Sequence, residues 1–259
     1  MKILSWNVNG IRAAAAKGLL DWWQQEDADI VCLQEVKVFP EQLGFDLRYP
    51  AGYQATWHAG QRPGYAGTAT FSKAVPKRQV TNFGSLTNFH QHGRVVEVAF
   101  DQFTLLNIYF PNGNPNAKGE ERLSYKLQFY ADCLHYLNAL RQRGESLVIC
   151  GDFNVAHQAI DLARPQENKD SIGFLPVERA WLDEFTRHGY VDVFRHFNPA
   201  LADVYSWWSY RSGARKRNVG WRLDYFFVSP NLIEKVKNIT HQTAIMGSDH
   251  CPLALELEL

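Results

Sequence analysis

Short apolar runs of strand length alternate with stretches of helical periodicity along the whole chain, and this alternation limits the possible folds more than any other feature. The run 147–150 contains no charged or amide side chain, which is typical of a strand buried on both faces. Asp101-Gln102 separates two apolar runs and predicts a tight hairpin turn, so at least part of a sheet is antiparallel. A layered α+β or α/β domain follows, although the pattern alone does not choose among its topologies.

The expected strands are rich in β-branched and aromatic residues, and they are 3–8, 30–35, 54–58, 67–72, 94–100, 103–110, 147–152, 205–209, 223–228 and 253–259. The expected helices are 13–25, 120–143 and 177–187, with a shorter one near 231–236. In the first helix, Leu19, Leu20, Trp22 and Trp23 form an apolar stripe that predicts packing against a sheet.

We expect a single catalytic domain over residues 1–259, because the chain contains no linker, repeat or low-complexity tract. Its apolar runs are much shorter than the roughly 20 residues that cross a bilayer. The N-terminal residues lead directly into a strand without the pattern of a signal peptide. These features predict a monomeric cytoplasmic protein, associated with the nucleoid in a prokaryote, that has no membrane partner.

Charge and cysteine content exclude several classes of protein. The 27 basic and 27 acidic side chains give zero net charge, which argues against a protein that coats nucleic acid through charge alone. A local acidic metal site beside a basic patch remains compatible with this balance. The four cysteines form no Cys-x-x-Cys pair, so we expect reduced core cysteines rather than a metal knuckle or a redox dithiol.

Polar side chains stand at the ends of several expected strands. Asp152 and Asn154 follow the run 147–150 and are two residues apart, so on an extended chain they point to the same side. Comparable residues at other strand ends are Asn7, Asn9, Glu35, Tyr109, Asn112, Asp224, Asp249 and His250. Each has a local explanation as a cap or turn residue. Together they predict a site, because strand ends in one layer open onto a common rim.

The residue types at these strand ends narrow the chemistry. Carboxylates and amides are hard oxygen donors that suit Mg²⁺ or Mn²⁺. A metal, an imidazole, amides and a tyrosine hydroxyl together suit a phosphate group, which needs charge neutralisation and attack by water. The sequence lacks both the Gly-x-Ser-x-Gly elbow of serine hydrolases and the Gly-rich P-loop motif. Metal-dependent hydrolysis of a phosphodiester or phosphomonoester is therefore predicted.

Seven motifs carry a resemblance to a known family. In chain order they are SWNVNGIRA, VCLQEVK, NIYFPNG, CGDFNVAH, GFLPVERAWLDEF, NVGWRLDYFF and GSDHCP. They resemble the exonuclease III family of abasic-site endonucleases over essentially the whole chain, within the wider DNase I-like superfamily. The resemblance implies a four-layer α/β sandwich, in which two mostly antiparallel or mixed β sheets pack face to face between helices.

The resemblance also implies a role for each matching residue in a metal site. Glu35 is expected to be the principal Mg²⁺ ligand, with Asn9 and Asp249 near the ion and with Mn²⁺ able to substitute. Asp152 is expected to orient or deprotonate the attacking water. Asn154 and Asn7 are expected to hold water, phosphate or neighbouring carboxylates.

Further roles concern the substrate phosphate. His250 is expected to contact the scissile phosphate, with Asp224 supporting the imidazole. Tyr109 is expected to donate a hydrogen bond to the phosphate, although a direct nucleophilic role has also been considered for this position in the family. Asn112 matches a further amide on the substrate side.

The segment 205–226 interleaves aromatic and cationic side chains, as a nucleic-acid groove does. The resemblance places Trp207, Trp221 and Leu223 around an apolar pocket for the base-less sugar and places Arg211 along the duplex. We expect the phosphates to be contacted by Arg215, Lys216 and Arg217. The pair His90 and His92 resembles a metal motif only superficially, because two histidines alone make a poor site.

The expected activity is Mg²⁺-dependent hydrolysis of the phosphodiester 5′ to an abasic site, together with 3′→5′ exonuclease or 3′-phosphodiesterase activity. The expected partner is double-stranded DNA that carries abasic sites or 3′ blocks. One alternative is a phosphatase or lipid phosphodiesterase on the same scaffold, for which the apolar pocket has no purpose. Another is a nucleic-acid-binding regulator with reduced catalysis, which is expected to have lost at least one of the polar strand-end residues.

Overall fold

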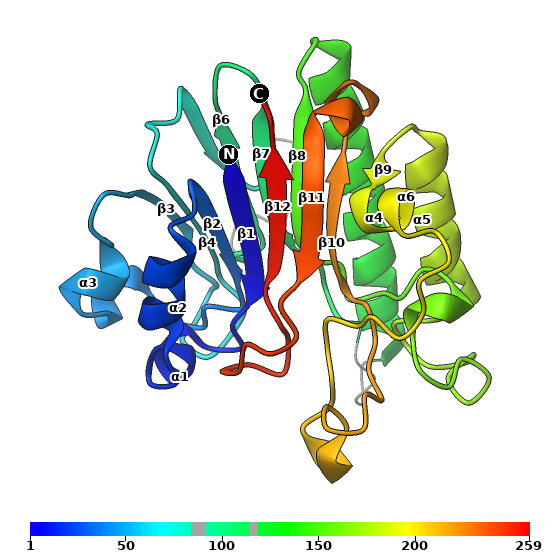
Figure 1. Cartoon of the computed structure of the whole chain (residues 1–259). Coiled ribbons are helices and arrows are strands. Elements are labelled where there is room, and N and C mark those ends of the chain that lie inside the picture. Colours follow the sequence, from blue (N-terminus) through cyan, green and yellow to red (C-terminus); the bar gives the residue numbers. More distant parts are fainter. Residues whose placement is uncertain (84–91, 114–118) are drawn as a thin grey trace.

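The computed structural model describes residues 1–83, 92–113 and 119–259, and these build two sheets packed face to face (Figure 1). The first sheet has the strand order β11 (Val236–His241), β12 (Leu253–Leu257), β1 (Lys2–Asn7), β2 (Ile30–Gln34), β4 (Thr68–Ser72) and β3 (Gln54–His58). The second has the order β5 (Arg78–Thr81), β6 (Val95–Ala99), β7 (Thr104–Tyr109), β8 (Leu147–Asp152), β10 (Asp224–Val228) and β9 (Val191–Asp192). Both sheets are mixed, since β1–β2 and β7–β8 are parallel and the other pairs are antiparallel.

Helices cover the outer face of each sheet (Figure 1). The α-helices are α1 (Ile11–Ala15), α2 (Leu19–Glu26), α3 (Phe45–Arg48), α4 (Gly119–Gln142), α5 (Pro176–Arg187) and α6 (Val193–Phe197). Short 3₁₀ segments are η1 (Pro40–Gln42), η2 (Ala159–Asp161), η3 (Arg211–Gly213) and η4 (Pro230–Lys235). The predicted four-layer α/β sandwich is confirmed.

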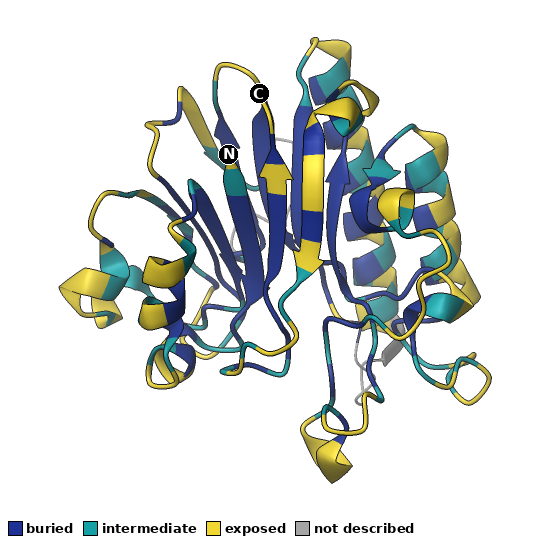
Figure 2. Cartoon of the chain, in the orientation of Figure 1, coloured by how far each residue is buried: buried dark blue, intermediate teal, exposed yellow. Residues whose placement is uncertain are grey.

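The apolar strand runs are explained by burial on both faces (Figure 2). On β1, Ile3 packs between the two sheets, whereas Leu4 packs with residues of α1 and α2. On β8, Val148 packs between the sheets, whereas Ile149 packs with residues of α4 and α5. Side chains alternate along a strand, so a strand between two apolar layers needs apolar residues at every position.

Strand direction brings the polar strand ends together. Parallel pairing places the C-terminal ends of β1 and β2 at one edge, and the same holds for β7 and β8. The antiparallel strands β10 and β12 begin at that edge, because Asp224 pairs with Asp152 and Leu253 pairs with Ser5. In Figure 1 this common edge is the lower end of both sheets. Every predicted site residue that ends or precedes one of these strands therefore faces the same rim.

Two predicted elements are wrong. The helix expected over 13–25 is divided into α1 and α2, because Gly18 adopts a left-handed conformation at φ 97° and starts the second helix. The strand expected over 205–209 forms only isolated bridges, which join Trp207 to Trp221 on one side and to His250 on the other. Residues 205–209 therefore bridge the segments that contain Trp221 and His250, but they do not form a continuous strand pair with either segment.

Strands β5, β9 and β11 were not predicted, and neither were α3 and α6. Each of these strands lies at a sheet edge, where β9 has only two residues and where β5 and β11 carry exposed polar side chains. An edge strand needs no continuous apolar run and so gives little periodic signal. The predicted hairpin at Asp101-Gln102 is confirmed, since it joins antiparallel β6 and β7.

The predicted state of the cysteines is also confirmed, because all four are buried and free. Within residues 1–83, 92–113 and 119–259, none of the helices combines the length and apolar character needed to cross a bilayer.

Candidate active site

Asp152 lies at the centre of the rim, at the last position of β8, and its side chain is buried. One carboxylate oxygen accepts the Asn154 backbone N–H at 2.9 Å. The other accepts the side-chain amides of Asn7 at 2.9 Å and Asn154 at 3.0 Å. Asp152 and Asn154 therefore face one another, as their spacing predicts, and the Asn7 amide from the opposite sheet joins them. These neutral donors orient the carboxylate without cancelling its charge.

Backbone conformation aims several of these side chains. Asn9, Glu35 and Asn154 follow the ends of β1, β2 and β8, and all three adopt a left-handed conformation with φ of 47°, 51° and 55°. This conformation is uncommon for residues other than glycine and asparagine, and Glu35 in particular is unusual there. Such backbone strain concentrates at functional sites. Here it turns each strand end so that a polar side chain enters the rim.

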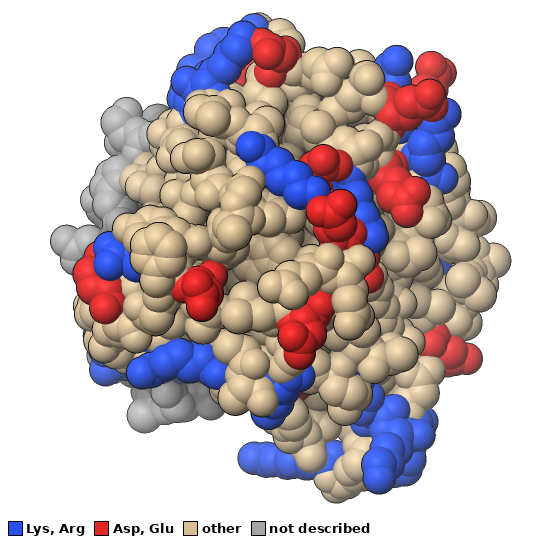
Figure 3. All heavy atoms as spheres, turned by 60° about the vertical axis from the view of Figure 1, so that its left-hand side comes forward, with Lys and Arg blue, Asp and Glu red and all other residues tan. Residues whose placement is uncertain are grey.

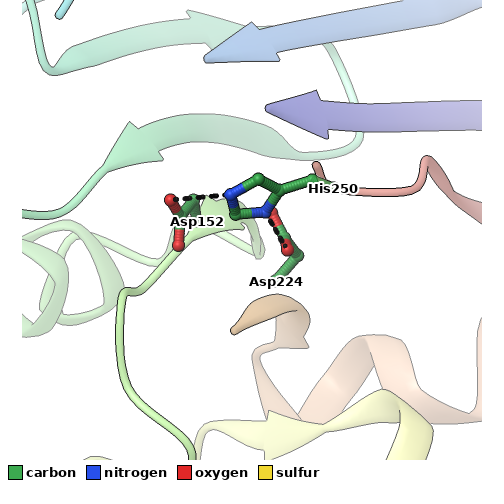
Figure 4. Close-up of side chains that lie close together, drawn as sticks. All are labelled: Asp152, Asp224 and His250. Carbon is green, nitrogen blue, oxygen red and sulfur yellow. Dashed lines mark hydrogen bonds and ion pairs between the residues drawn. The ribbon is translucent and has the colours of Figure 1, made fainter. Parts of the chain in front are cut away.

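His250 is held between two carboxylates (Figure 4). Its Nδ1 lies 2.7 Å from Asp224 Oδ2, and its Nε2 lies 3.9 Å from Asp152 Oδ2. Burial alone would lower the pKa of His250, but Asp224 and Asp152 raise it to about 10. The imidazole is therefore protonated at neutral pH, with Nε2–H directed to the rim.

The same charges act on Asp152. Burial raises the pKa of Asp152 to about 7, the nearby His250 opposes this shift, and the carboxylates of Asp224 and Glu35 add to it. A carboxylate whose pKa lies near neutrality is suited to accept a proton from water. Asp152 and His250 thus form an acceptor and a cationic donor in one site.

We expect Asp224→Asn to lower the pKa of His250 towards its ordinary value, because the substitution removes the closest negative charge. The histidine should then lose its proton at lower pH, and above that pH the site should lose its cation. NMR titration of the imidazole in metal-free protein measures this shift directly. His241 is an internal control: burial holds its pKa near 3, so its ring should stay neutral in both proteins. An unchanged His250 titration would contradict this assignment of the charges.

Oxygen atoms of Glu35 and Asn9 lie next to the ammonium group of Lys37. Glu35 Oε2 lies 2.6 Å from Lys37 Nζ, and the same ammonium group donates a short hydrogen bond to Asn9 Oδ1. Asn9 Nδ2 in turn donates to Asp249 Oδ1 at 2.9 Å. Burial would raise the pKa of Glu35, but the Lys37 ammonium and the Tyr109 hydroxyl lower it below the ordinary value. The ionised carboxylate and the amide oxygen fit a divalent cation, for which the ammonium is a stand-in.

Asp152, Asp224 and His250 also place metal-ligand atoms within 4.8 Å of one another. However, the imidazole is hydrogen-bonded to Asp224, and because its pKa is raised to about 10 it keeps its proton at neutral pH. A metal would have to displace that proton. The oxygen donors around Lys37 therefore fit a metal better than this triad does.

Tyr109 joins the two sheets at the rim. Its hydroxyl donates to Glu35 Oε1 at 2.6 Å, and the Arg94 guanidinium lies over its ring at 4.8 Å. Burial raises the pKa of Tyr109 well above its ordinary value, and the Glu35 charge raises it further. The hydroxyl is therefore a hydrogen-bond donor at neutral pH, which favours the predicted contact to phosphate over a nucleophilic role.

A cavity of about 590 Å³ connects this polar centre to an apolar wall. Trp207, Trp221 and Leu223 line this cavity together with Asp152 and His250. The two indole rings meet edge to face with centroids 6.4 Å apart. The Trp207 indole N–H also donates to Asp249 Oδ2 at 3.1 Å, so the wall is bonded to the polar centre. The structure thus brings the predicted pocket and the predicted catalytic residues into one space.

Several residues on this cavity were missed. Asp170, Ser171 and Ile172 line it from the loop that precedes α5, and Gly173 completes the wall. This loop reads as an ordinary polar turn in the sequence, so only its place in the fold identifies it. Exposed Asn112 was predicted and lines the same cavity.

The segment around η3 projects from the rim as an arm with Lys and Arg side chains at its tip (Figures 1 and 3). Arg211, Lys216 and Arg217 are exposed there. Arg215 is different, because its guanidinium lies over the Trp208 ring at 4.7 Å and donates to main-chain carbonyls. These carbonyls belong to Thr243, Ile245 and Ser248 and lie at 2.9, 2.6 and 3.0 Å.

The expectation that Arg215 contacts phosphate is therefore corrected. Its donors hold the loop that leads into Asp249 and His250. The histidine pair also gains no support as a metal site, since His92 stacks on Tyr125 with centroids 5.3 Å apart. His90 lies outside the described residues.

We expect the exposed cations of the arm to set part of the salt dependence of DNA binding. Each phosphate contact contributes about −0.9 to the slope of log affinity against log salt for duplex DNA. The variant Lys216→Ala/Arg217→Ala should therefore flatten the slope by up to about 1.8. Its matched control is Lys235→Ala/Lys237→Ala, at the far end of β11, which should leave the slope unchanged. Equal slopes in the arm variant and the unmodified protein would place the DNA elsewhere.

Fold and site together define a hydrolase of phosphate esters that is built around two sheets and an acidic rim. Residues 4–250 match the Endonuclease/Exonuclease/phosphatase family, and the chain belongs to this family. An exodeoxyribonuclease of Bacillus subtilis (strain 168) is 43% identical over 260 residues and covers all of both chains. A DNA-(apurinic or apyrimidinic site) endonuclease of Dictyostelium discoideum is 40% identical over 261 residues, which are 100% of this chain and 71% of that protein.

A solved structure shows the same fold. A variant of the 3′ phosphatase NExo from Neisseria, bound to a product DNA hairpin, superposes with a TM-score of 0.89 at 27% identity, with 100% of both chains covered. These similarities confirm the predicted family and the prediction that the chain is a nuclease.

Proposed function

We propose that this nuclease is a Mg²⁺-dependent abasic-site endonuclease that acts as a monomer on double-stranded DNA. It hydrolyses the phosphodiester 5′ to the abasic site, and the same centre removes 3′ nucleotides and 3′ blocking groups. The observation that carries this proposal is the continuous cavity between the wall of Trp207, Trp221 and Leu223 and the centre of Asp152 and His250. An apolar recess beside a hydrolytic centre suits a base-less sugar that has been extruded from the helix.

Glu35 and Asn9 would hold the metal ion, with Asp249 beside them. When bound, the metal neutralises phosphate charge and stabilises the departing 3′ oxygen. Asp152 orients the attacking water and accepts its proton, while the amides of Asn7 and Asn154 hold the carboxylate in place.

The phosphate itself is bound by groups on both sheets. Protonated His250 lies beside Asp152 and offers a positive charge to the phosphate oxygens, on which negative charge develops during attack by water. Asp224 fixes the ring through Nδ1. Tyr109 and Asn112 offer further hydrogen-bond donors towards the phosphate, and Arg211 lies along the duplex.

Two alternatives are less well supported. A phosphatase or lipid phosphodiesterase has no use for the apolar wall of Trp207, Trp221 and Leu223 that lines the cavity. A regulator with reduced catalysis is expected to lack at least one polar group. Here Asp152, Asp224 and His250 are all present in hydrogen-bonded geometry. Incision of an abasic duplex with and without EDTA tests the proposed activity: incision that persists in EDTA would exclude the metal-dependent mechanism.

Trp221→Ala tests the selectivity of the pocket. The substitution removes part of the apolar wall and so enlarges the pocket, but it leaves the proposed metal ligands intact, so abasic preference should fall before phosphodiester cleavage does. Losing one aromatic contact costs about 1–3 kcal/mol, or roughly 5- to 150-fold in preference. The measurement is the ratio of abasic incision to 3′ exonuclease rate on an undamaged duplex. A folded variant that loses both activities equally would contradict a separate role for the pocket.

A further inference from the structure

Lys126 and Glu178 form a buried ion pair that is hydrogen-bonded to two residues lining the active-site cavity and lies outside the groups that the reaction uses. Both side chains are 0% exposed, and Lys126 Nζ lies 2.5 Å from Glu178 Oε1. Lys126 lies on α4, and Glu178 lies in the first turn of α5 within the motif GFLPVERAWLDEF. Burying two charges has a large desolvation cost, and apolar residues of similar size often stabilise a protein equally well. Stability alone is therefore a weak explanation for the pair.

The remaining hydrogen bonds of the pair go to the segment after β8 and to the loop that leads into α5, where Leu175 is the N-cap residue. Lys126 Nζ donates to the main-chain oxygen of Asn154 at 2.8 Å. Glu178 Oε2 accepts the backbone N–H groups of Gly173 at 2.7 Å and Leu175 at 3.0 Å. The pair thus links the end of β8, where Asp152 and Asn154 lie, to the loop that walls the cavity.

This loop is in close contact with the sugar pocket. Gly173 has φ 88°, and a side-chain carbon built there would lie 3.3 Å from the Asn154 carbonyl oxygen and 3.4 Å from the Trp221 ring. The next residue, Phe174, packs with Leu223 and meets the Trp221 ring edge to face at 6.4 Å. A shift of the loop would therefore move the wall against which the sugar rests.

The aliphatic part of Lys126 supports a third segment. A side-chain carbon built on Gly113 would lie 3.2 Å from Lys126 Cδ and 3.2 Å from Ile172 Cγ2. The residue before Gly113 is Asn112, on the substrate side of the cavity. Lys126 therefore packs near the segment that contains Asn112 and donates a hydrogen bond to Asn154. Through Glu178 it is also linked to Gly173.

We propose that Lys126 and Glu178 are positioning residues that set the spacing between the Asp152–Asn154 centre and the pocket wall. Through this spacing they determine how strongly the enzyme prefers an abasic sugar over an intact nucleotide. The inference rests on the proposed abasic-site specificity of the same cavity. It gives the motif GFLPVERAWLDEF a physical function, because Gly173, Phe174 and Glu178 together build one wall of the cavity.

Glu178→Gln is the first test, because the amide keeps the size of the side chain but removes the charge that binds Lys126. Small displacements of a substrate-positioning group change rates by up to about 100-fold. We expect a roughly 10- to 100-fold lower ratio of abasic incision to 3′ exonuclease rate, through a higher KM for abasic duplex. The exonuclease kcat should stay within about threefold of the unmodified enzyme.

Glu97→Gln is the matched control. Glu97, on β6 of the second sheet, is another buried carboxylate, and it accepts hydrogen bonds from Arg78 on β5 and Tyr136 on α4. Its substitution should lower the thermal stability in the same manner while leaving the activity ratio unchanged. If Glu97→Gln changes the ratio as much as Glu178→Gln does, the effect is general destabilisation and the proposal is wrong.

A second variant covers the case in which Glu178→Gln does not fold. Lys126→Met/Glu178→Leu replaces both ions by apolar groups, a change that buried pairs often tolerate. It should fold and still show the lower ratio, whereas an unchanged ratio in the folded double variant overturns the proposal. Failure of the proposed function is distinguishable, because the unmodified enzyme would then show no abasic preference at all.

Discussion

Asp152→Asn is expected to reduce single-turnover cleavage of abasic duplex by about 10²- to 10⁴-fold, the range typical of a lost general base. The asparagine keeps the size of the side chain and can still accept the hydrogen bond from the Asn154 backbone N–H. It cannot accept a proton from water, and it removes the negative charge that lies 3.9 Å from His250. Binding of the DNA should survive, because the pocket wall and the arm are unchanged.

Binding is expected to become tighter, because the substitution removes a buried carboxylate that faces the phosphate. Fluorescence anisotropy with abasic duplex in EDTA measures this affinity separately from cleavage. Asp132→Asn, at a partly buried position of α4 that does not line the cavity, is the matched control and should alter neither quantity. Near-normal cleavage by Asp152→Asn would remove Asp152 from the proton-accepting role.

The sequence predicts that the polar strand ends meet at one rim, because strand ends are a local property. The two-residue spacing of Asp152 and Asn154 predicts a shared side on an extended chain, and in the structure Asn154 reaches Asp152 from a left-handed conformation just after β8. The parallel pairs β1–β2 and β7–β8 then bring separate strand ends to a single edge. Apolar runs also identify central strands, whose residues are buried on both faces.

The supporting interactions could not be predicted from the sequence, because they depend on how distant segments pack. Lys126 and Glu178 are 52 residues apart on two helices, and each alone reads as a solvent-facing charge. Arg215 belongs to a basic run, but its guanidinium turns inward to the carbonyls of the loop before Asp249. Nothing in local periodicity separates such a residue from its exposed neighbours Lys216 and Arg217.

The edge strands could not be predicted from the sequence for a related reason. In strand β11 the exposed polar residues do not alternate regularly with buried residues, because the strand lies at the edge of its sheet and faces solvent there. Its assignment depends on pairing with β12, which is a tertiary contact. The polar rim and the central strands can therefore be predicted from short stretches of sequence. The edge strands, and the buried side chains that support the site residues, cannot.

Glu35→Gln is expected to lower incision by roughly two to three orders of magnitude at low Mg²⁺, because the partly buried carboxylate that we propose holds the ion loses its negative charge. Glutamine can still accept the hydrogen bond from the Tyr109 hydroxyl, which donates to Glu35 Oε1 at 2.6 Å. The substitution therefore keeps the shape of the rim and isolates the effect of the charge. It also weakens the attraction of Lys37, whose ammonium group lies 2.6 Å from Glu35 Oε2.

Higher Mg²⁺ or Mn²⁺ should restore part of the activity of Glu35→Gln, because occupancy of a weakened site recovers by mass action. Calorimetric titration with each ion, in the absence of DNA, measures the loss of affinity independently of turnover. Glu41→Gln is the control, since that carboxylate is 69% exposed on the turn after β2 and should not affect metal binding. If Glu35→Gln keeps normal activity at low Mg²⁺, Glu35 does not hold the ion. The oxygen donors around Asp152 and Asp249 would then be the remaining candidates.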